Sequence, residues 1–385
     1  MNPLFTFTGA KKIVFGKGAL ERLPEHLADL KGKRPLVVLD GALSRAGLRE
    51  RVCRLLEAAG GSVAVYDAVE GEPALEQADE GARLALENQC DTVVGIGGGS
   101  AMDAAKAMAA VAGNRARAVD FLGLNRVPGP GLPTIMVPTT AGTGSEVTFT
   151  AVFIRKDLKK KEGMNSPYLY PDVALLDPLL TAGLPPPATA TTGMDALCHA
   201  IESYTSVNAS PMSALVSLEA IRLIGANLRT AVHDGPNLRA REAMLLGSLY
   251  AGLGLANAGV TAVHSLSYPL GGRFGVPHGL ANTILLPAVM EFNLPGALEK
   301  FAAVAGALGE DVDGMPPREA APLAAEAVNA LIRDCCIPMG LGRLGVGEAD
   351  FPDLAAVAMT VARPLANNPR RVTAEDAVAI YREAF

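Results

Sequence analysis

The sequence predicts an α/β domain over residues 1–185, followed by an all-helical domain over residues 186–385. In the first half, strand-like and helix-like segments alternate, which is typical of parallel strands joined by helical crossovers. Three consecutive prolines, at positions 185–187, then interrupt the pattern. After them strand signals almost vanish, and Ala/Leu-rich helical patterns continue to the end of the chain.

The expected elements follow from hydrophobic patterning and from turn residues. In the first half, buried strands are expected at residues 35–40, 61–66, 91–96, 134–137 and 173–177. Helices are expected at 48–59, at 77–90 and after the glycines at 97–99, where an Ala-rich run favours a helix. In the second half, helices are expected at 193–204, 212–224, 239–255, 298–305, 318–336 and 374–385.

Composition excludes several kinds of partner. Of 385 residues, 49% are hydrophobic and 19% charged, which is enough for sizeable cores. The net charge of −6 gives no reason to expect nucleic acid or an anionic membrane as partner. Five cysteines without a Cys-x-x-Cys pair, and an N-terminus unlike a secretory signal, predict a cytoplasmic protein with reduced thiols.

One long stretch without charged residues raises the question of a membrane span. No Asp, Glu, Lys or Arg occurs from Ala243 to Gly272, which is long enough to span a bilayer. Polar residues and glycines interrupt it, however, so helices buried inside a bundle explain it better than a membrane span.

A candidate metal site begins on the helix expected at 193–204. Asp195 and His199 are four residues apart, so they share one helix face and are offset by about 6 Å along its axis. His264 and His278 follow, in apolar surroundings, in a chain with five histidines. One carboxylate and three imidazoles suit Fe²⁺ or Zn²⁺ better than Mg²⁺ or Ca²⁺. The alternative is an Asp–His hydrogen bond and two unrelated core histidines.

A glycine-rich turn follows the strand expected at 91–96. Gly97, Gly98, Gly99 and Ser100 lead into a helix, where backbone N–H groups and the helix N-terminus can hold a phosphate. The spacing differs from a dinucleotide fingerprint, so a tight turn without any ligand is the alternative.

Two further polar sites fit a nucleotide. Thr139, Thr140 and Thr143 lie in a second glycine-rich turn, whose hydroxyls and amides can contact a ribose or a pyrophosphate; the alternative is a solvated loop. Asp40 ends a predicted strand, where a carboxylate can accept from a ribose hydroxyl and repel a 2′-phosphate, favouring NAD over NADP. Its alternative role is to cap the next helix.

With these residues in place, the chain resembles the metal-dependent alcohol dehydrogenase family, of the iron-containing or group III type, over essentially its whole length. Further matching motifs carry the resemblance besides the sites already named. They are Phe15-Gly16-Lys17-Gly18-Ala19-Leu20, Asp103 with Lys106 after the first glycine turn, Gly279-Leu280-Ala281-Asn282 after His278, and Asn368-Pro369-Arg370.

The resemblance implies the architecture shared by iron-type alcohol dehydrogenases and dehydroquinate synthase: a dinucleotide-binding α/β domain, then a helical metal-binding domain. It implies that Asp195, His199, His264 and His278 bind the metal. The cofactor contacts that it implies are Asp40, Gly97, Gly98, Gly99, Ser100, Asp103, Thr139, Thr140, Thr143 and Lys161.

The implied reaction is the NAD-dependent interconversion of a small primary alcohol and its aldehyde, with NADP less suited. Fe²⁺ or Zn²⁺ would polarise the substrate oxygen while hydride passes to or from the nicotinamide. Relatives also imply a homo-oligomer, a dimer being expected.

One residue departs from the pattern of the family. Tyr268 stands where many relatives have a histidine, four residues after His264. Tyr268, or the hydroxyls of residues 139–145, is our candidate for passing the proton to solvent. The surrounding segment is more similar to the branch of hydroxyacid-oxoacid transhydrogenases and 4-hydroxybutyrate-type dehydrogenases, so these are the alternative activities.

Overall fold

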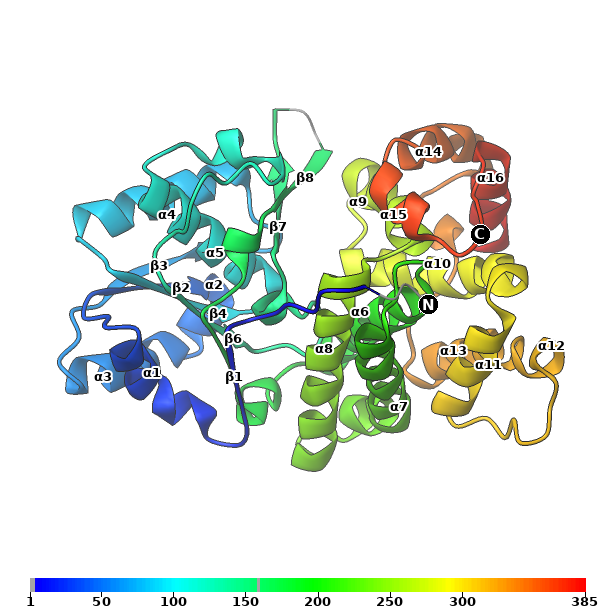
Figure 1. Ribbon diagram of the computed structural model, residues 1–385, viewed down its shortest axis with the longest axis horizontal. Coiled ribbons are helices and arrows are strands. Elements are labelled where there is room, and N and C mark those ends of the chain that lie inside the picture. The colour runs from blue at the N-terminus through cyan, green and yellow to red at the C-terminus, as the bar shows by residue number, and fades with distance from the viewer. Residues whose placement is uncertain (1–3, 158–159) are drawn as a thin grey trace. The chain divides into compact units, whose positions relative to one another are not determined.

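The computed structural model describes residues 4–157 and 160–385, which form two compact units (Figure 1). Residues 9–140 and 144–181 form the first, which we call the sheet unit. Residues 182–385 form the second, the helical unit, together with the short segments 4–8 and 141–143. The chain therefore enters the helical unit briefly at residues 141–143, within the second glycine-rich turn.

A six-stranded parallel sheet forms the centre of the sheet unit, in the order β1-β9-β6-β4-β2-β3. Its strands are β1 (Lys12–Phe15), β2 (Pro35–Asp40), β3 (Ala64–Val69), β4 (Thr92–Gly97), β6 (Thr134–Pro138) and β9 (Val173–Leu176). The helices are α1 (Leu23–Asp29), α2 (Gly41–Arg45), α3 (Leu48–Ala58), α4 (Leu75–Glu87) and α5 (Gly99–Asn114). The expected parallel α/β arrangement is confirmed.

Helices cover both faces of this sheet, and alternate residues of each strand face opposite ways. Leu36 and Val38 of β2 pack in one buried cluster with α4 and α5. Val37 and Leu39 pack in the other with α1 and α3. Both faces of the strand are therefore buried, which explains its continuous apolar run.

Helices α1 and α2 were not expected, and the helix expected at 77–90 is α4, which ends at Glu87. The strands of the sheet unit differ from the expectation in three places. The strand expected at 61–66 is β3 and starts three residues later, because Gly60 (φ +85°) and Gly61 still close the end of α3. The edge strand β1 was not expected from so short a segment. A second, three-stranded sheet was also missed, with β5 (Gly123–Leu124), β7 (Thr150–Arg155) and the largely polar β8 (Lys160–Asn165).

The helical unit contains no strand within residues 182–385, all of which are described. Its helices are α6 (Pro186–Thr205), α7 (Pro211–His233), α8 (Leu238–Ala258), α9 (Ala262–Phe274), α10 (His278–Asn293), α11 (Leu298–Ala307), α12 (Pro317–Ala320), α13 (Leu323–Asp334), α14 (Phe351–Ala358), α15 (Ala362–Asn367) and α16 (Ala374–Glu383). The single helix expected at 318–336 is wrong, because Pro322 separates α12 from α13.

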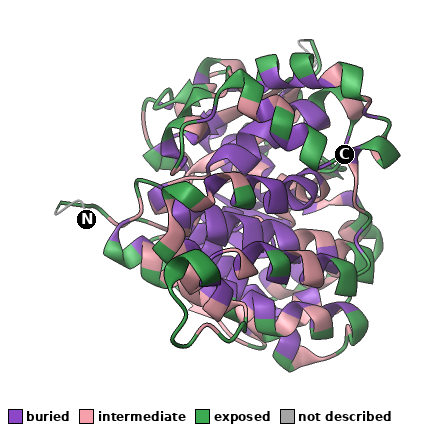
Figure 2. Cartoon of the chain, turned by 90° about the vertical axis from the view of Figure 1, so that its right-hand side faces the viewer, coloured by how far each residue is buried: buried purple, intermediate pink, exposed green. Residues whose placement is uncertain are grey.

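The uncharged stretch that raised the membrane question lies on α8 and α9. Among the described residues no single helix is long and apolar enough to cross a membrane; α8 and α9 pass that test only as a pair, and this pair is bent by 102°. Most of α9 is buried, and in Figure 2 buried residues fill the interior while exposed residues lie on outer turns.

Candidate metal centre

Helix α6 presents three acidic or basic side chains on one face. Pro186 stands at its first turn, where a missing N–H costs nothing. Every residue from Gly193 to Ser203 is buried, so this part of the helix is packed on all sides. Asp195, His199 and Glu202 occupy positions i, i+4 and i+7, which lie on the same face of a helix.

The two other histidines lie at the beginnings of α9 and α10. His264 is in the first turn of α9, and His278 is the first residue of α10. Gly279 allows α10 to approach α6 closely, since a Cβ there would stand 2.7 Å from the carbonyl oxygen of Thr191. A larger residue at this position would push His278 away from α6.

The structure brings the four predicted ligands together within the helical unit. One donor atom from each of Asp195, His199, His264 and His278 lies within 4.8 Å of the other three. The Nε2 atoms of His199 and His264 are 3.1 Å apart, and Asp195 Oδ1 is 4.0 Å from His199 Nε2. Two unrelated core histidines would not produce this convergence.

Asn282 shows that the donor atoms fit a cation. Its Nδ2 lies 2.8 Å from Asp195 Oδ1 and 3.2 Å from the Nε2 atoms of both His264 and His278. Three acceptors thus share the two protons of one amide, and among the described residues Asn282 Oδ1 has no hydrogen-bond partner. A cation would satisfy lone pairs that this amide cannot. Oxygen and imidazole donors in this number fit Fe²⁺ or Zn²⁺.

Glu202 holds the His264 ring by a hydrogen bond on its Nδ1 side. It accepts a short hydrogen bond from His264 Nδ1, which leaves the lone pair of Nε2 directed to the other donors. Glu202 Oε1 also accepts from the backbone N–H groups of Thr261 (2.9 Å), Val263 (3.0 Å) and His264 (3.4 Å). The carboxylate therefore caps the N-terminus of α9, where negative charge is favourable. A carboxylate bonded to a ligating histidine is the usual outer partner of a metal site.

Our sequence reasoning missed Glu202 and Asn282, although both carried a signal. Glu202 follows His199 by three residues and Asn282 follows His278 by four, so each lies on the helix face of a proposed ligand. Helical spacing from a candidate ligand was therefore enough to find them.

Burial and neighbouring charges shift the pKa values of these groups. Burial alone would raise the pKa of Asp195, but the three imidazoles and Asn282 outweigh it, and the pKa lies below its usual range. Burial lowers the pKa of His199, which favours the neutral imidazole. Burial also opposes charge on His264, but Glu202 overrides it and raises that pKa.

Tyr268 and Cys198 lie beside the centre. The Tyr268 ring stacks on His278 at 6.0 Å between centroids and meets His264 edge-on at 6.3 Å. Burial, with the charges of Glu202 and Asp195, raises the pKa of Tyr268 to about 12. Cys198 Sγ donates to Glu202 Oε2 at 3.6 Å, and burial raises its pKa, so the thiol stays protonated.

The first glycine-rich turn lies in the sheet unit and joins β4 to α5. Gly97 has φ +152°, and a Cβ there would stand 2.7 Å from the Cβ of Ala101, so this position requires glycine. Gly98 and Gly99 then lead into α5, whose N-cap is Gly98, with Ser100 in the first turn. The turn thus ends at a helix N-terminus, the arrangement that binds phosphate.

The other predicted cofactor residues make contacts within the protein. Asp40 is the N-cap of α2 and accepts from the Ala42 N–H at 2.7 Å, as our alternative for it anticipated. Lys161 on β8 forms an ion pair with Glu72. Thr139 and Thr140 follow β6 in the sheet unit, and Thr143 lies in the segment that packs with the helical unit.

Glu146, just after the second turn, is a buried carboxyl whose Oε1 lacks a hydrogen-bond partner among the described residues. Burial raises its pKa from the ordinary value of 4.5 to about 7, although the charge of Lys106 opposes this. The folded state therefore holds this proton more tightly than the unfolded state does. Stability should fall as the pH rises from about 4.5 to about 7, because ionisation is then penalised only in the folded protein.

Glu146→Gln should remove this pH dependence. We expect the variant to be more stable than the wild type at pH 8 by up to roughly 3 kcal/mol, since one pKa unit corresponds to about 1.4 kcal/mol. Near pH 4.5 the difference should be much smaller. Urea unfolding at both pH values measures it, and an equal difference at both would contradict the assignment.

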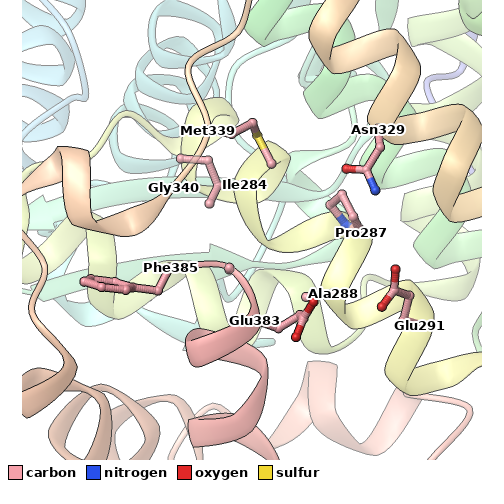
Figure 3. Close-up of a pocket in the computed structure, with 10 residues that line it drawn as sticks. Ile284, Pro287, Ala288, Glu291, Asn329, Met339, Gly340, Glu383 and Phe385 are labelled. Atoms are coloured by element: carbon pink, nitrogen blue, oxygen red, sulfur yellow. The ribbon is translucent and has the colours of Figure 1, made fainter.

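A cavity of about 270 Å³ lies elsewhere in the helical unit, between α10, α13 and the C-terminal residues (Figure 3). Ile284, Pro287, Met339 and Phe385 are among the residues that line it, with Glu291 at one side. None of the four candidate ligands is among its lining residues.

Two protein-family models match the sequence of this chain. A family model described as iron-containing alcohol dehydrogenase matches residues 10–178. A second, described as the C-terminal part of the Fe-containing alcohol dehydrogenase family, matches residues 189–385. Together they cover both units.

Individual relatives match over nearly the whole chain. Long-chain-alcohol dehydrogenase 1 of Geobacillus thermodenitrificans is 41% identical, over 96% of this chain and 94% of its own length. A crystal structure of 1,3-propanediol oxidoreductase has a TM-score of 0.96 and 38% identity, covering 99% of this chain and 100% of that one. Sulfoacetaldehyde reductase from Bifidobacterium kashiwanohense, in complex with NAD⁺, has a TM-score of 0.87 and 31% identity, covering 99% and 98%.

Proposed function

Because this chain belongs to the iron-containing alcohol dehydrogenase family, and is thus an oxidoreductase of alcohols and aldehydes, we propose that it uses NAD and Fe²⁺ on small primary alcohols. The observation that carries the proposal is the convergence of one carboxylate and three imidazoles inside the helical unit. A terminal alcohol or aldehyde as substrate is supported by the names of the 1,3-propanediol and sulfoacetaldehyde enzymes. NAD is supported by the NAD⁺ complex of the latter.

Oxidation of an alcohol removes a hydride from its carbon and a proton from its hydroxyl, and NAD, when bound, would accept the hydride. When bound, the ion polarises the substrate oxygen and so makes this proton easier to remove. The ion would be held by Asp195, His199, His264 and His278. Asp195, His199 and His264 are buried and His278 is half-buried, and a site with little water strengthens the charge interactions within it. Glu202 keeps the proton of His264 on Nδ1, so that Nε2 stays available as a donor atom.

We propose that Tyr268 acts as a hydrogen-bond donor to the substrate oxygen, while the proton released from the alcohol passes to solvent. Its ring stacks on His278 and meets His264 edge-on, so the side chain lies beside the four donors. At neutral pH the hydroxyl keeps its own proton, so it can donate a hydrogen bond to a substrate oxygen. Tyr268→Phe should therefore reduce kcat on the order of tenfold, the loss of one hydrogen bond of about 1.4 kcal/mol, and leave metal content unchanged. An unchanged kcat would remove this role.

The proposed function has a direct test. Protein purified without oxygen is analysed for iron and zinc, then mixed with NAD⁺ and short alcohols, diols or hydroxy acids. We expect stoichiometric iron and NADH that accumulates far beyond the enzyme concentration. A transhydrogenase would keep its nucleotide bound and release no NADH, and it would turn over only when an oxo acid is supplied to accept the hydride. Stoichiometric zinc with full activity would change the ion but leave the reaction in place.

Asp40 tests the preference for NAD. We expect Asp40→Gly to improve kcat/KM for NADP⁺ relative to NAD⁺ on the order of tenfold, about 1.4 kcal/mol, because a carboxylate there repels the 2′-phosphate. Glycine is tolerated at an N-cap, so α2 should remain folded. Asp91→Gly is the matched control, since Asp91 precedes β4 at the amino ends of the strands. An unchanged ratio in Asp40→Gly would refute the assignment.

Two broader expectations belong to the same proposal. A cytoplasmic location is supported by the five cysteines, which form no disulfide among the described residues. A homodimer follows from the resemblance to the family, and sedimentation analysis of the purified protein tests it.

A further inference from the structure

A buried cation in the sheet unit is not used by the reaction described above. Lys106 lies on α5, and only 1% of its surface is exposed. Its ammonium donates to the backbone oxygens of Ser145 (3.0 Å) and Thr150 (2.5 Å), and lies 3.1 Å from Asp103 Oδ1. Burying an ammonium group is costly unless it is paired and hydrogen-bonded, as it is here.

Asp103, one turn earlier on α5, accepts hydrogen bonds from the same segment, residues 145–152, with both of its carboxylate oxygens. Oδ1 accepts from Ser145 Oγ at 2.5 Å, and Oδ2 accepts from the backbone N–H of Val152 at 2.9 Å. With a further hydrogen bond from Lys106 to Thr148 Oγ1 at 3.5 Å, the two side chains form five hydrogen bonds from α5 to residues 145–152. Each oxygen of Asp103 is therefore already engaged with a group of the protein itself.

These bonds connect the two glycine-rich turns. The first turn ends where α5 begins, so α5 carries both the turn and the Asp103–Lys106 pair. The second turn begins at Thr139, whose N–H donates to Gly97 O at 2.9 Å, and it closes at Ser145. The two turns are thus joined at both ends of residues 139–145.

We propose that Asp103 and Lys106 are positioning residues that hold the two glycine-rich turns in one geometry, ready to receive the dinucleotide. The inference rests on the proposed function in assigning the turns to NAD. It replaces direct contact by Asp103, which the sequence led us to expect, with an effect exerted through Ser145 and its neighbours. Preorganisation of this kind raises the affinity for the cofactor, because none of the binding free energy is then used to order the loop.

The test measures cofactor affinity separately from folding and metal binding. NADH binding to the metal-loaded protein is followed by fluorescence, together with KM for NAD⁺, kcat at saturating NAD⁺, metal content and melting temperature. Asp103→Ala and Lys106→Met should raise the Kd for NADH and the KM for NAD⁺ by roughly 10- to 100-fold, as expected for misplacement of a binding loop by about 1 Å. Metal content should not change.

Milder variants keep the proposal testable if those two fail to fold. Ser145→Ala removes one hydrogen bond to Asp103 and should raise the Kd a few-fold. Asp103→Asn can still accept from the Val152 N–H and should have a smaller effect than Asp103→Ala.

Asp79→Ala is the matched control for Asp103→Ala. Asp79 is also a half-buried carboxylate of the sheet unit, and it accepts from the Ala118 N–H at 2.7 Å, away from both turns. This variant should lose stability but keep the wild-type Kd, which separates positioning from a purely structural role. If the wild type binds NADH and folded Asp103 and Lys106 variants bind it equally well, the inference is wrong. A wild type that does not bind NADH would instead contradict the proposed function.

Discussion

Replacing His278 with alanine is expected to remove most of the bound metal and to lower kcat/KM by roughly 10³-fold or more, since about 4 kcal/mol of charge stabilisation would be lost. His278, the first residue of α10, supplies one of the four converging donors, and alanine has no donor atom to replace it. Metal analysis of the purified variant and steady-state kinetics measure the two effects.

A second histidine of the helical unit provides the control. His233, at the end of α7, is exposed, and its Nε2 lies 2.7 Å from the backbone oxygen of Asp334. His233→Ala should keep both metal and activity. Full activity with stoichiometric metal in His278→Ala would count decisively against the site.

Removal of Glu202 should have the second-largest effect. In Glu202→Ala, the buried N–H groups of Thr261, Val263 and His264 lose their acceptor, and so does His264 Nδ1. Breaking a buried pair of this kind costs about 3–5 kcal/mol of folding stability. Because His264 is then free to rotate and to change tautomer, metal affinity should also fall by about 10- to 100-fold.

Two comparisons separate the effect on the metal from the effect on folding. Chelator titration of the folded variant measures metal affinity, and urea unfolding measures stability. Glu202→Gln keeps an acceptor oxygen but cannot satisfy all the donors. Its stability and its metal affinity should therefore lie between those of the wild type and those of Glu202→Ala. Glu219→Ala removes a partly exposed carboxylate paired with Arg222 and should change stability by less than about 1 kcal/mol. Wild-type metal affinity in a folded Glu202→Ala variant would show that Glu202 does not orient His264.

The parallel sheet could be predicted because its central strands are buried on both faces and therefore appear as continuous apolar runs. The same reasoning could not find β8, whose sequence Lys-Lys-Glu-Gly-Met-Asn has no such run. It also did not define α9 and α10, which contain Pro269 and Pro287 inside their helical spans. Packing in a buried bundle outweighs the local cost of these prolines.

Local spacing in the sequence placed only two of the four candidate ligands relative to one another. Asp195 and His199 share a helix face by virtue of their spacing, whichever fold the chain adopts. That His264 and His278 meet them depends on the sharp bend between α8 and α9 and on the close packing at Gly279. Spacing gives no access to such tertiary features. The scarcity of histidines and their apolar surroundings made these two residues candidates, and the resemblance to a family strengthened the prediction.

The path of the chain at residues 141–143 has a consequence for dissecting the protein. A fragment beginning at residue 182 would contain every helix of the helical unit but lack two pieces that complete its packing. Asn257 would lose the backbone of Thr8, with which its amide exchanges hydrogen bonds of 2.7 and 2.8 Å, and Thr192 would lose its neighbour Gly142. The two halves of this polypeptide should therefore be poor candidates for separate expression, and co-expressed pieces should recombine better when the cut spares both segments.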